Sequence, residues 1–173
     1  MASVRELLVR HKAAAVGIGL AVLLISWLAW YFSDRQVIKR QLTAMAWDVS
    51  REPQESTMET AIKMRDVKAV LASQCRVTVP ETHLDESFER DMGIMYLMNY
   101  RSRYQMLAPS FEEMEISFPA DNVAAVQATV LLKRQKQQGQ PTEVTAPVRL
   151  TLQKTDGDWL LNHAELAAAL LDN

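Results

Sequence analysis

The chain has 173 residues, of which 49% are hydrophobic and 23% are charged, a length that suits one ordinary domain. Its 19 basic and 21 acidic side chains give a formal net charge of −2, which argues against nucleic-acid binding because such proteins carry a basic surface. The single cysteine, Cys75, excludes an intramolecular disulfide and a zinc site built on several thiolates. The three histidines are far apart in the sequence, so we expect no metal site. The sequence contains no glycine-rich phosphate loop, and we expect no cofactor.

An uncharged run of 20 residues from Ala13 to Phe32 has the length of a transmembrane helix. At a rise of 1.5 Å per residue, about 20 apolar residues cross a hydrocarbon layer of ~30 Å. Trp27, Trp30 and Tyr31 gather at one end of the run, and such rings favour the headgroup region. A cleaved signal peptide is the alternative, but its apolar region is shorter, about 7–15 residues. We therefore predict a cytoplasmic tail over residues 1–12, a single-pass anchor over residues 13–32 and one domain over residues 33–173.

The charges beside this run leave its orientation open. Three basic residues lie before it and three soon after it, so neither flank has the excess of positive charge that marks the cytoplasmic side. Because the tail is short, the simplest arrangement exports the domain, which predicts a bacterial inner-membrane protein with a periplasmic domain. Ala13, Gly17 and Ala21 recur every four residues, a spacing that lets two transmembrane helices approach closely in a homodimer.

Helical patterns dominate the first half of the expected domain. Apolar residues at helical spacing predict a first helix that ends near residue 50. Ser56 and Glu59 have the spacing of a capping box, which predicts a second helix that ends near residue 72. The β-rich segment Arg76–Pro80 predicts a short edge strand, and a long third helix is expected over residues 85–108. The expected face of this third helix comprises Phe88, Met92, Met95, Asn99 and Met106.

The second half of the domain changes to a period of two. Apolar and polar residues alternate over residues 114–118, 124–132 and 144–152, as in strands with one buried face. Asp156-Gly157 is a two-residue hairpin signal, after which Trp159 opens a fourth strand. Three helices followed by a four-strand antiparallel meander predict an α+β fold in which the helices cover the apolar face of the sheet.

Three positions near the end of the chain carry narrower expectations. Pro147 lacks a backbone N–H in the middle of a strand, so that strand is an edge there or contains a bulge. Trp159 shares strand parity with Leu161 and is expected in the core or at its rim. From His163 onward the chain either continues the last strand or forms a short helix, which its alanine and leucine residues favour.

This order of elements, ending in Asp-Gly-Asp-Trp-Leu-Leu at residues 156–161, resembles the nuclear transport factor 2-like, or SnoaL-like, superfamily. In that cystatin-like fold a strongly curved sheet wraps the long helix into a cone. The resemblance covers about residues 34–168, and the stretch Trp47–Ser56 is similar to small bacterial members with an N-terminal membrane anchor. It implies a transmembrane helix followed by a cone-shaped domain of three helices packed on a curved antiparallel sheet.

Enzymes of the superfamily place an acid or base inside the cone, often Asp or His with a Tyr partner. The polar residues that could lie there are Asp48, His83, Tyr96, Asn99, Tyr100, Tyr104 and His163. We expect an exposed His83, because it follows Pro80 in a loop, and a buried His163, because it shares the parity of Leu161. The methionines of the third helix fill the core or line a site for an apolar ligand. Our ligand-binding candidates are Trp47, Met95, Tyr96, Asn99, Tyr100 and His163, and no catalytic residue is identified.

A membrane anchor without a catalytic motif favours a non-catalytic binding or scaffold module. Such a module acts through protein contacts or through a small apolar ligand. Two alternatives stay open: a SnoaL-like pocket enzyme, an isomerase or hydrolase, on an apolar substrate, and an assembly subunit of a secretion system, by analogy with periplasmic domains of type IV secretion systems. Fold alone does not choose between them.

Overall fold

The computed structural model describes residues 23–24 and 33–171 of the chain. The predicted tail 1–12 and nearly all of the predicted anchor 13–32 lie outside these residues. Among the residues that are described, no helix combines the length and the apolar character needed to cross a membrane. The chain divides into two compact units, residues 1–38 and 39–173, and the second contains the whole sheet described below.

Three α-helices are present in the described residues, as predicted: α2 (Asp34–Val49), α3 (Thr57–Val70) and α4 (Arg90–Ser102). The capping box at the start of α3 is confirmed, since the Glu59 backbone N–H donates to Ser56 Oγ at 3.2 Å and the Ser56 N–H donates to Glu59 Oε2 at 3.4 Å. The expected long third helix is wrong at both ends, because the residues before and after α4 pair as strands. Met92, Met95 and Met98 lie exposed on α4, so the interpretation of these methionines as core is also wrong.

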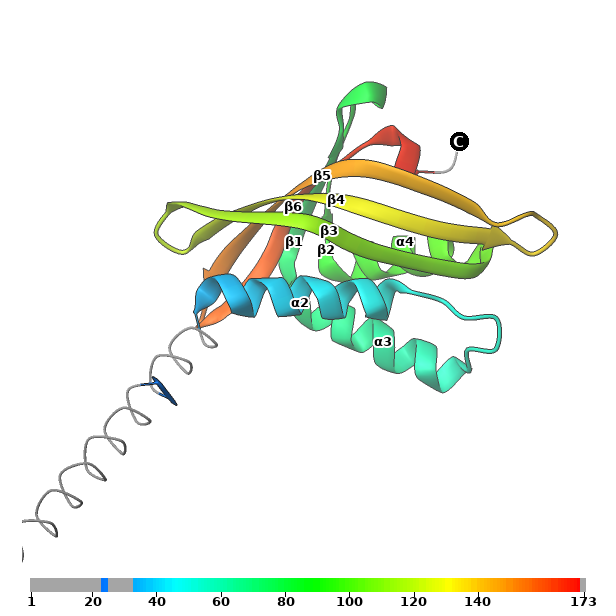
Figure 1. Ribbon diagram of the computed structural model, residues 1–173, viewed down its shortest axis with the longest axis horizontal. Helices are drawn as coiled ribbons and strands as arrows, with labels where there is room; N and C mark the ends of the chain where they lie inside the picture. Colours follow the sequence, from blue (N-terminus) through cyan, green and yellow to red (C-terminus); the bar gives the residue numbers. More distant parts are fainter. Residues whose placement is uncertain (1–22, 25–32, 172–173) are drawn as a thin grey trace, which may run out of the picture. The chain divides into compact units, whose positions relative to one another are not determined.

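Six strands form one sheet in the order β2-β1-β6-β5-β4-β3 (Figure 1). The predicted four-strand meander is present as β3 to β6, but β1 pairs parallel to β6, so the sheet is mixed rather than antiparallel. The expected edge strand β1 lies between β2 and β6, and β2, the true edge, was not predicted. The strands are β1 (Leu71–Val79), β2 (Leu84–Glu89), β3 (Tyr104–Ala120), β4 (Val123–Lys136), β5 (Thr142–Thr155) and β6 (Asp158–Leu166), with short 3-10 helices η1 (Pro80–Thr82) and η2 (Ala168–Leu170).

The turn between β5 and β6, the position of Pro147 and the end of β6 agree with the predictions from the sequence. Asp156 and Gly157 have φ angles of 54° and 96°, the left-handed pair that a tight hairpin turn requires. β6 ends opposite Val148, so β5 at Pro147 has only β4 beside it and is a local edge, as predicted. Of the two alternatives for the end of the chain, both are found in part: β6 continues through His163, and the alanine- and leucine-rich residues after it form the short 3-10 helix η2.

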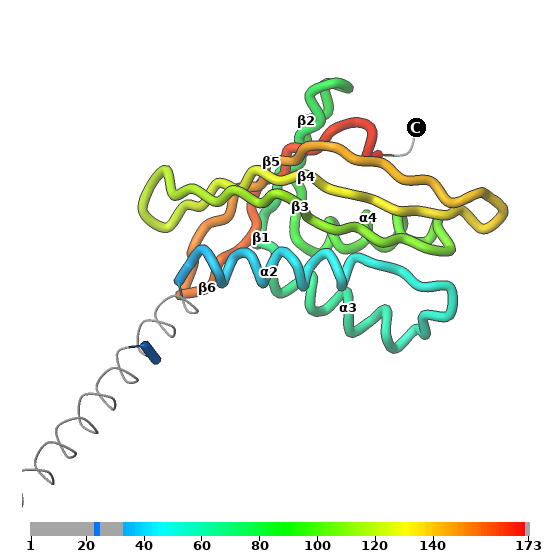
Figure 2. Tube along the Cα trace, viewed as in Figure 1, coloured from blue at the N-terminus to red at the C-terminus, as the bar shows by residue number. Residues whose placement is uncertain are grey.

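Register shifts curve the sheet around its apolar face. β3 and β4 slip between Glu112 and Glu115, where Glu113 has a positive φ of 51°, and β5 and β6 slip between Thr151 and Leu152. Extra residues of this kind bend a strand and increase its twist. Figure 2 shows β3, β4 and β5 arching over α4, with the helices on one side of the sheet. The side chains of this unit that are at most 3% exposed are Leu42, Val67, Val79, Arg101, Tyr104, Leu107, Ala124, Val126, Val148, Leu152 and Trp159.

A buried ionic cluster joins the α2–α3 connection to the end of α4. Glu55 Oε2 lies 2.9 Å from Lys63 Nζ, and Glu55 Oε1 lies 2.7 Å from Arg101 Nη2, with all three side chains at most 7% exposed. Arg101 also donates to the Ser50 carbonyl at 2.5 Å. Burial alone would raise the pKa of Glu55, but hydrogen bonds from Thr60, Lys63 and Arg101 outweigh it and lower the pKa to about 2. The cluster therefore fixes this connection with Glu55 ionised.

Candidate functional site

The candidate site is an apolar cavity of about 420 Å³ between α4 and the concave face of the sheet, called here the apolar cavity. One wall comes from β1, β2 and α4, the opposite wall from β3, β4 and β5, and residues at the end of the chain complete the lining. The lining residues are Val77, Leu84, Glu86, Phe88, Tyr96, Leu97, Tyr100, Pro109, Phe111, Val130, Leu132, Val148, Leu150, Leu166, Leu170 and Leu171.

Strand parity produces the lining of this cavity. Val130 and Leu132 on β4 share the face of Val148 and Leu150 on β5, because residues two apart on a strand point to the same side. Each of these four side chains is buried, so the sheet presents a continuous apolar surface. The alternation read from the sequence in these two strands is therefore what forms the cavity wall.

A glycine on α4 makes room for an aromatic residue of β2, on the same wall of the cavity. A Cβ atom at Gly93 would lie 2.7 Å from Cε2 of Phe88, a distance that side chains do not tolerate. The Phe88 ring therefore sits against the backbone of α4, where it meets the Tyr96 ring edge-on at 5.8 Å. This packing fixes two aromatic rings at one side of the cavity.

Hydrogen bonds fasten the last described residues, 167–171, over the cavity; they are called the C-terminal segment below. The Tyr100 hydroxyl donates to the Leu170 carbonyl at 2.8 Å. Arg134 Nη1 lies 3.3 Å from that same carbonyl and 3.3 Å from the hydroxyls of Tyr100 and Tyr104. On the other side of the segment, the Ala168 N–H donates to Glu81 at 3.3 Å. The segment is thus held from both sides.

The structure brings only two of the six predicted ligand-binding residues, Tyr96 and Tyr100, into the cavity. Met95 is 59% exposed on α4, Asn99 is exposed on the same helix, and Trp47 is exposed on α2 with Lys63 Nζ 5.3 Å from its ring centroid. Met95 and Asn99 are absent from the lining because α4 directs Tyr96, Leu97 and Tyr100 toward the cavity.

The remaining polar candidates lie elsewhere. His163 is half-buried, its Nε2 lies 3.1 Å from Thr78 Oγ1, and it lines a separate hollow of about 170 Å³ beside Cys75. His83 is exposed, as predicted, and Tyr104 is buried beside Arg134. Burial, with the nearby Asp66 carboxylate, raises the pKa of Asp48, and burial raises the pKa of the Cys75 thiol, but neither group lines the apolar cavity.

Within the described residues, the titratable groups that line the cavity are Glu86, Tyr96 and Tyr100. No aspartate and no histidine lines it, so the acid or base that the resemblance implies is not found there among these residues. Sequence reasoning missed Glu86 and Phe88 because their strand, β2, was interpreted as the start of a helix. The parity of Leu84, Glu86 and Phe88 would have indicated one face of a strand.

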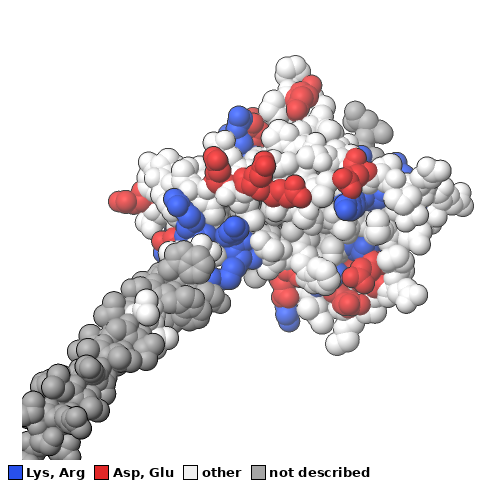
Figure 3. Space-filling view, viewed as in Figure 1, with Lys and Arg blue, Asp and Glu red and all other residues white. Residues whose placement is uncertain are grey.

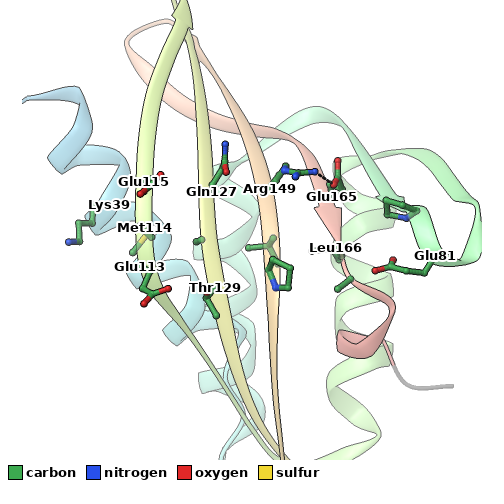
Figure 4. Close-up of a pocket in the computed structure, with 15 residues that line it drawn as sticks. Lys39, Glu81, Glu113, Met114, Glu115, Gln127, Thr129, Arg149, Glu165 and Leu166 are labelled. Carbon is green, nitrogen blue, oxygen red and sulfur yellow. Dashed lines mark hydrogen bonds and ion pairs between the residues drawn. The ribbon is translucent and has the colours of Figure 1, made fainter.

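A second depression of about 770 Å³ lies on the outer, convex face of the sheet (Figure 4). Its labelled side chains come from the four neighbouring strands β3 to β6, from Lys39 of α2 and from Glu81 of η1, and they include both signs of charge. The Arg149–Glu165 ion pair at 2.6 Å lies among them. Acidic side chains also form a band over the strands in the space-filling view (Figure 3). Because its walls are charged and solvated, this depression differs chemically from the apolar cavity.

Comparisons with known proteins show the fold. No protein-family model matches the chain, and no curated protein matches it. Among solved structures, a candidate scytalone dehydratase from Novosphingobium aromaticivorans superposes with a TM-score of 0.62 and 16% identity, over 77% of this chain and 82% of that one. A type 2 hexachlorocyclohexane dehydrochlorinase superposes with a TM-score of 0.62 and 12% identity, over 78% of this chain and 84% of that one. The association domain of calcium/calmodulin-dependent kinase II from C. elegans superposes with a TM-score of 0.57 and 12% identity, over 80% of this chain and 98% of that one.

At these low identities the likeness concerns architecture and not activity. A further match carries the description "cystatin-like fold", with a TM-score of 0.58 over 78% of this chain. The expected resemblance is therefore supported at the level of the fold: the domain has a curved α+β, cystatin-like architecture.

Proposed function

We propose that this chain is a binding protein whose curved domain holds a small, mostly apolar molecule in the apolar cavity. The observation that carries the proposal is the cavity itself, whose volume of about 420 Å³ falls within the range of ligand sites, roughly 300–1,000 Å³. Its lining is aliphatic and aromatic apart from one carboxylate and two phenols. Burying an eight-carbon chain there contributes roughly 6 kcal/mol before the entropic cost of binding, which suits a reversible complex.

Binding is favoured over catalysis by the polar groups at the cavity. A general base must reach the proton that it removes. Among the lining residues that the structure describes, the Tyr100 hydroxyl already donates a hydrogen bond to the Leu170 carbonyl, no histidine or aspartate is present, and the one carboxylate, Glu86, is exposed to solvent. The proposed anchor over residues 13–32 would hold the domain beside a bilayer, which is itself a source of apolar molecules.

A pocket enzyme is the second candidate. Its support is that solved structures of similar fold are described as a scytalone dehydratase and a hexachlorocyclohexane dehydrochlorinase. Such an enzyme would have to use Glu86, Tyr96 or Tyr100, the titratable groups of the lining. Incubating the chain with a lipid extract and analysing the extract by mass spectrometry separates the two functions. Binding leaves the captured molecules chemically unchanged, whereas an enzyme consumes one species and produces another.

Titration with the neutral fluorophore N-phenylnaphthylamine tests the binding proposal. We expect saturable binding to the full chain with competition by octanol. Val130→Phe places a ring in the cavity and should abolish that binding, whereas Gln127→Phe adds the same ring on the exposed face of the same strand and should not. Equal probe binding by the two variants would refute the proposal.

A further inference from the structure

One carboxylate lies on the wall of the apolar cavity. Residues of β2 alternate between two sides, and Leu84, Glu86 and Phe88 share the side that faces the cavity. Glu86 pairs in register with Val77 of β1, which also lines the cavity. Glu86 is exposed to solvent, so its carboxylate lies at the solvent-facing edge of the apolar lining.

The side chain of Glu86 makes no hydrogen bond and no ion pair with any residue that the structure describes, although its backbone is part of the β1–β2 ladder. Its neighbour Asp85, on the opposite side of β2, is by contrast held by Arg76, whose Nε lies 2.7 Å and Nη2 2.5 Å from the two carboxylate oxygens. The guanidinium of Arg134, which is not part of the lining, is bound to the Tyr100 and Tyr104 hydroxyls and to the Leu170 carbonyl. The wall therefore offers a negative charge to whatever enters the cavity.

The aromatic rings of Phe88 and Tyr96 line the cavity together with Glu86. Phe88 lies two residues from Glu86 on the same side of β2, and Tyr96 meets Phe88 edge-on at 5.8 Å. The close approach of Phe88 to Gly93 holds this pair in place. Phe88 is half-buried and Tyr96 is 51% exposed, so both rings can be reached from the solvent. The face of an aromatic ring attracts cations at exposed as well as desolvated sites, and aromatic side chains recognise quaternary ammonium groups in proteins.

We propose that the cavity selects amphiphiles with a cationic head, such as alkylammonium compounds. The ammonium group lies at Glu86, Phe88 and Tyr96, and the alkyl chain extends between α4 and the apolar face of β4 and β5. The inference rests on the proposed binding function and deepens it by naming the ligand class. An anionic amphiphile, such as a fatty acid, is disfavoured because its carboxylate would face the carboxylate of Glu86.

Three probes of equal chain length test the inference: octyltrimethylammonium, octanol and octanoate, each competing with N-phenylnaphthylamine for the full-length chain. The cation should bind roughly tenfold more tightly than the alcohol, and octanoate should bind most weakly. Glu86→Gln should reduce the affinity for the cation to about that for octanol. Glu89→Gln removes the same charge from the other side of β2 and should leave the preference intact.

Each outcome bears on a different claim. Equal affinity for the cation and the alcohol, or tighter binding of octanoate, would overturn the inference and leave the binding function standing. An equal loss of cation preference in Glu89→Gln and Glu86→Gln would also overturn it, because the effect would then be a general one of net charge. If none of the probes binds, the proposed function itself fails and the inference fails with it.

Discussion

Replacing Glu55 by glutamine removes the one anion of the buried ionic cluster while keeping the size of the side chain. Lys63 and Arg101 would then stay buried without a countercharge, since the cluster has both cations on the same carboxylate. Removing one partner of a buried ion pair costs about 3–5 kcal/mol. The pKa of Glu55, about 2 in the folded chain and roughly 4.3 when unfolded, leads independently to about 3 kcal/mol. We expect Glu55→Gln to lose about 3 kcal/mol of unfolding free energy at neutral pH.

Urea unfolding at several pH values measures this loss and its cause. Because the folded state lowers the pKa of Glu55, its ionised form stabilises the fold above about pH 5, and that contribution disappears as the pH falls toward 2. The difference between the natural chain and Glu55→Gln should therefore be constant at neutral pH and shrink in acid.

Glu143→Gln is the matched control, since Glu143 pairs with Lys133 at the surface at 3.5 Å and should change stability by less than about 0.5 kcal/mol. A loss below about 1 kcal/mol for Glu55→Gln, or a difference from the natural chain that does not vary with pH, would refute the reasoning.

Three further substitutions test the core, the C-terminal segment and the aromatic pair. Trp159→Ala removes a ring that is 3% exposed and should lower the free energy of urea unfolding by about 3–5 kcal/mol; an unchanged midpoint would show that the ring is not in the core. Tyr100→Phe removes the bond to the Leu170 carbonyl, worth about 0.5–1.5 kcal/mol, so amide exchange of the C-terminal segment should accelerate, and unaltered exchange would contradict the proposed fastening. Gly93→Ala should displace the Phe88 ring and weaken binding of octyltrimethylammonium, whereas unchanged affinity would show that the ring position is unimportant.

The strands with one buried face were predictable from local sequence. Alternation in β4 and β5 and the Asp156-Gly157 turn depend on neighbouring residues alone, and these elements form as predicted. The parallel pairing of β1 with β6 joins segments far apart in the chain, and no local pattern specifies such a pair. The expectation of a purely antiparallel sheet failed for that reason.

The missed strand β2 explains why Glu86 and Phe88 were absent from the predicted site. Leu84–Glu89 contains three acidic residues, which have low strand propensity, and the spacing of Phe88 and Met92 continues a helical pattern. Pairing with β1 overrides that local preference. Since Glu86 was assigned to a helix, its place beside the apolar cavity could not be predicted, whereas Tyr96 and Tyr100 lie in α4 and reach the cavity.

Photolabelling with a diazirine-bearing octanol tests most directly whether the apolar cavity is the ligand site. The reagent is added to the full-length chain, irradiated, and located by peptide mass spectrometry. We predict labels on β2, on α4 around Tyr96 and Tyr100, and on β4 around Val130, with loss of all of them in excess unlabelled octanol. Labels confined to the charged outer depression around Gln127 and Arg149, or labels that octanol does not displace, would contradict the account.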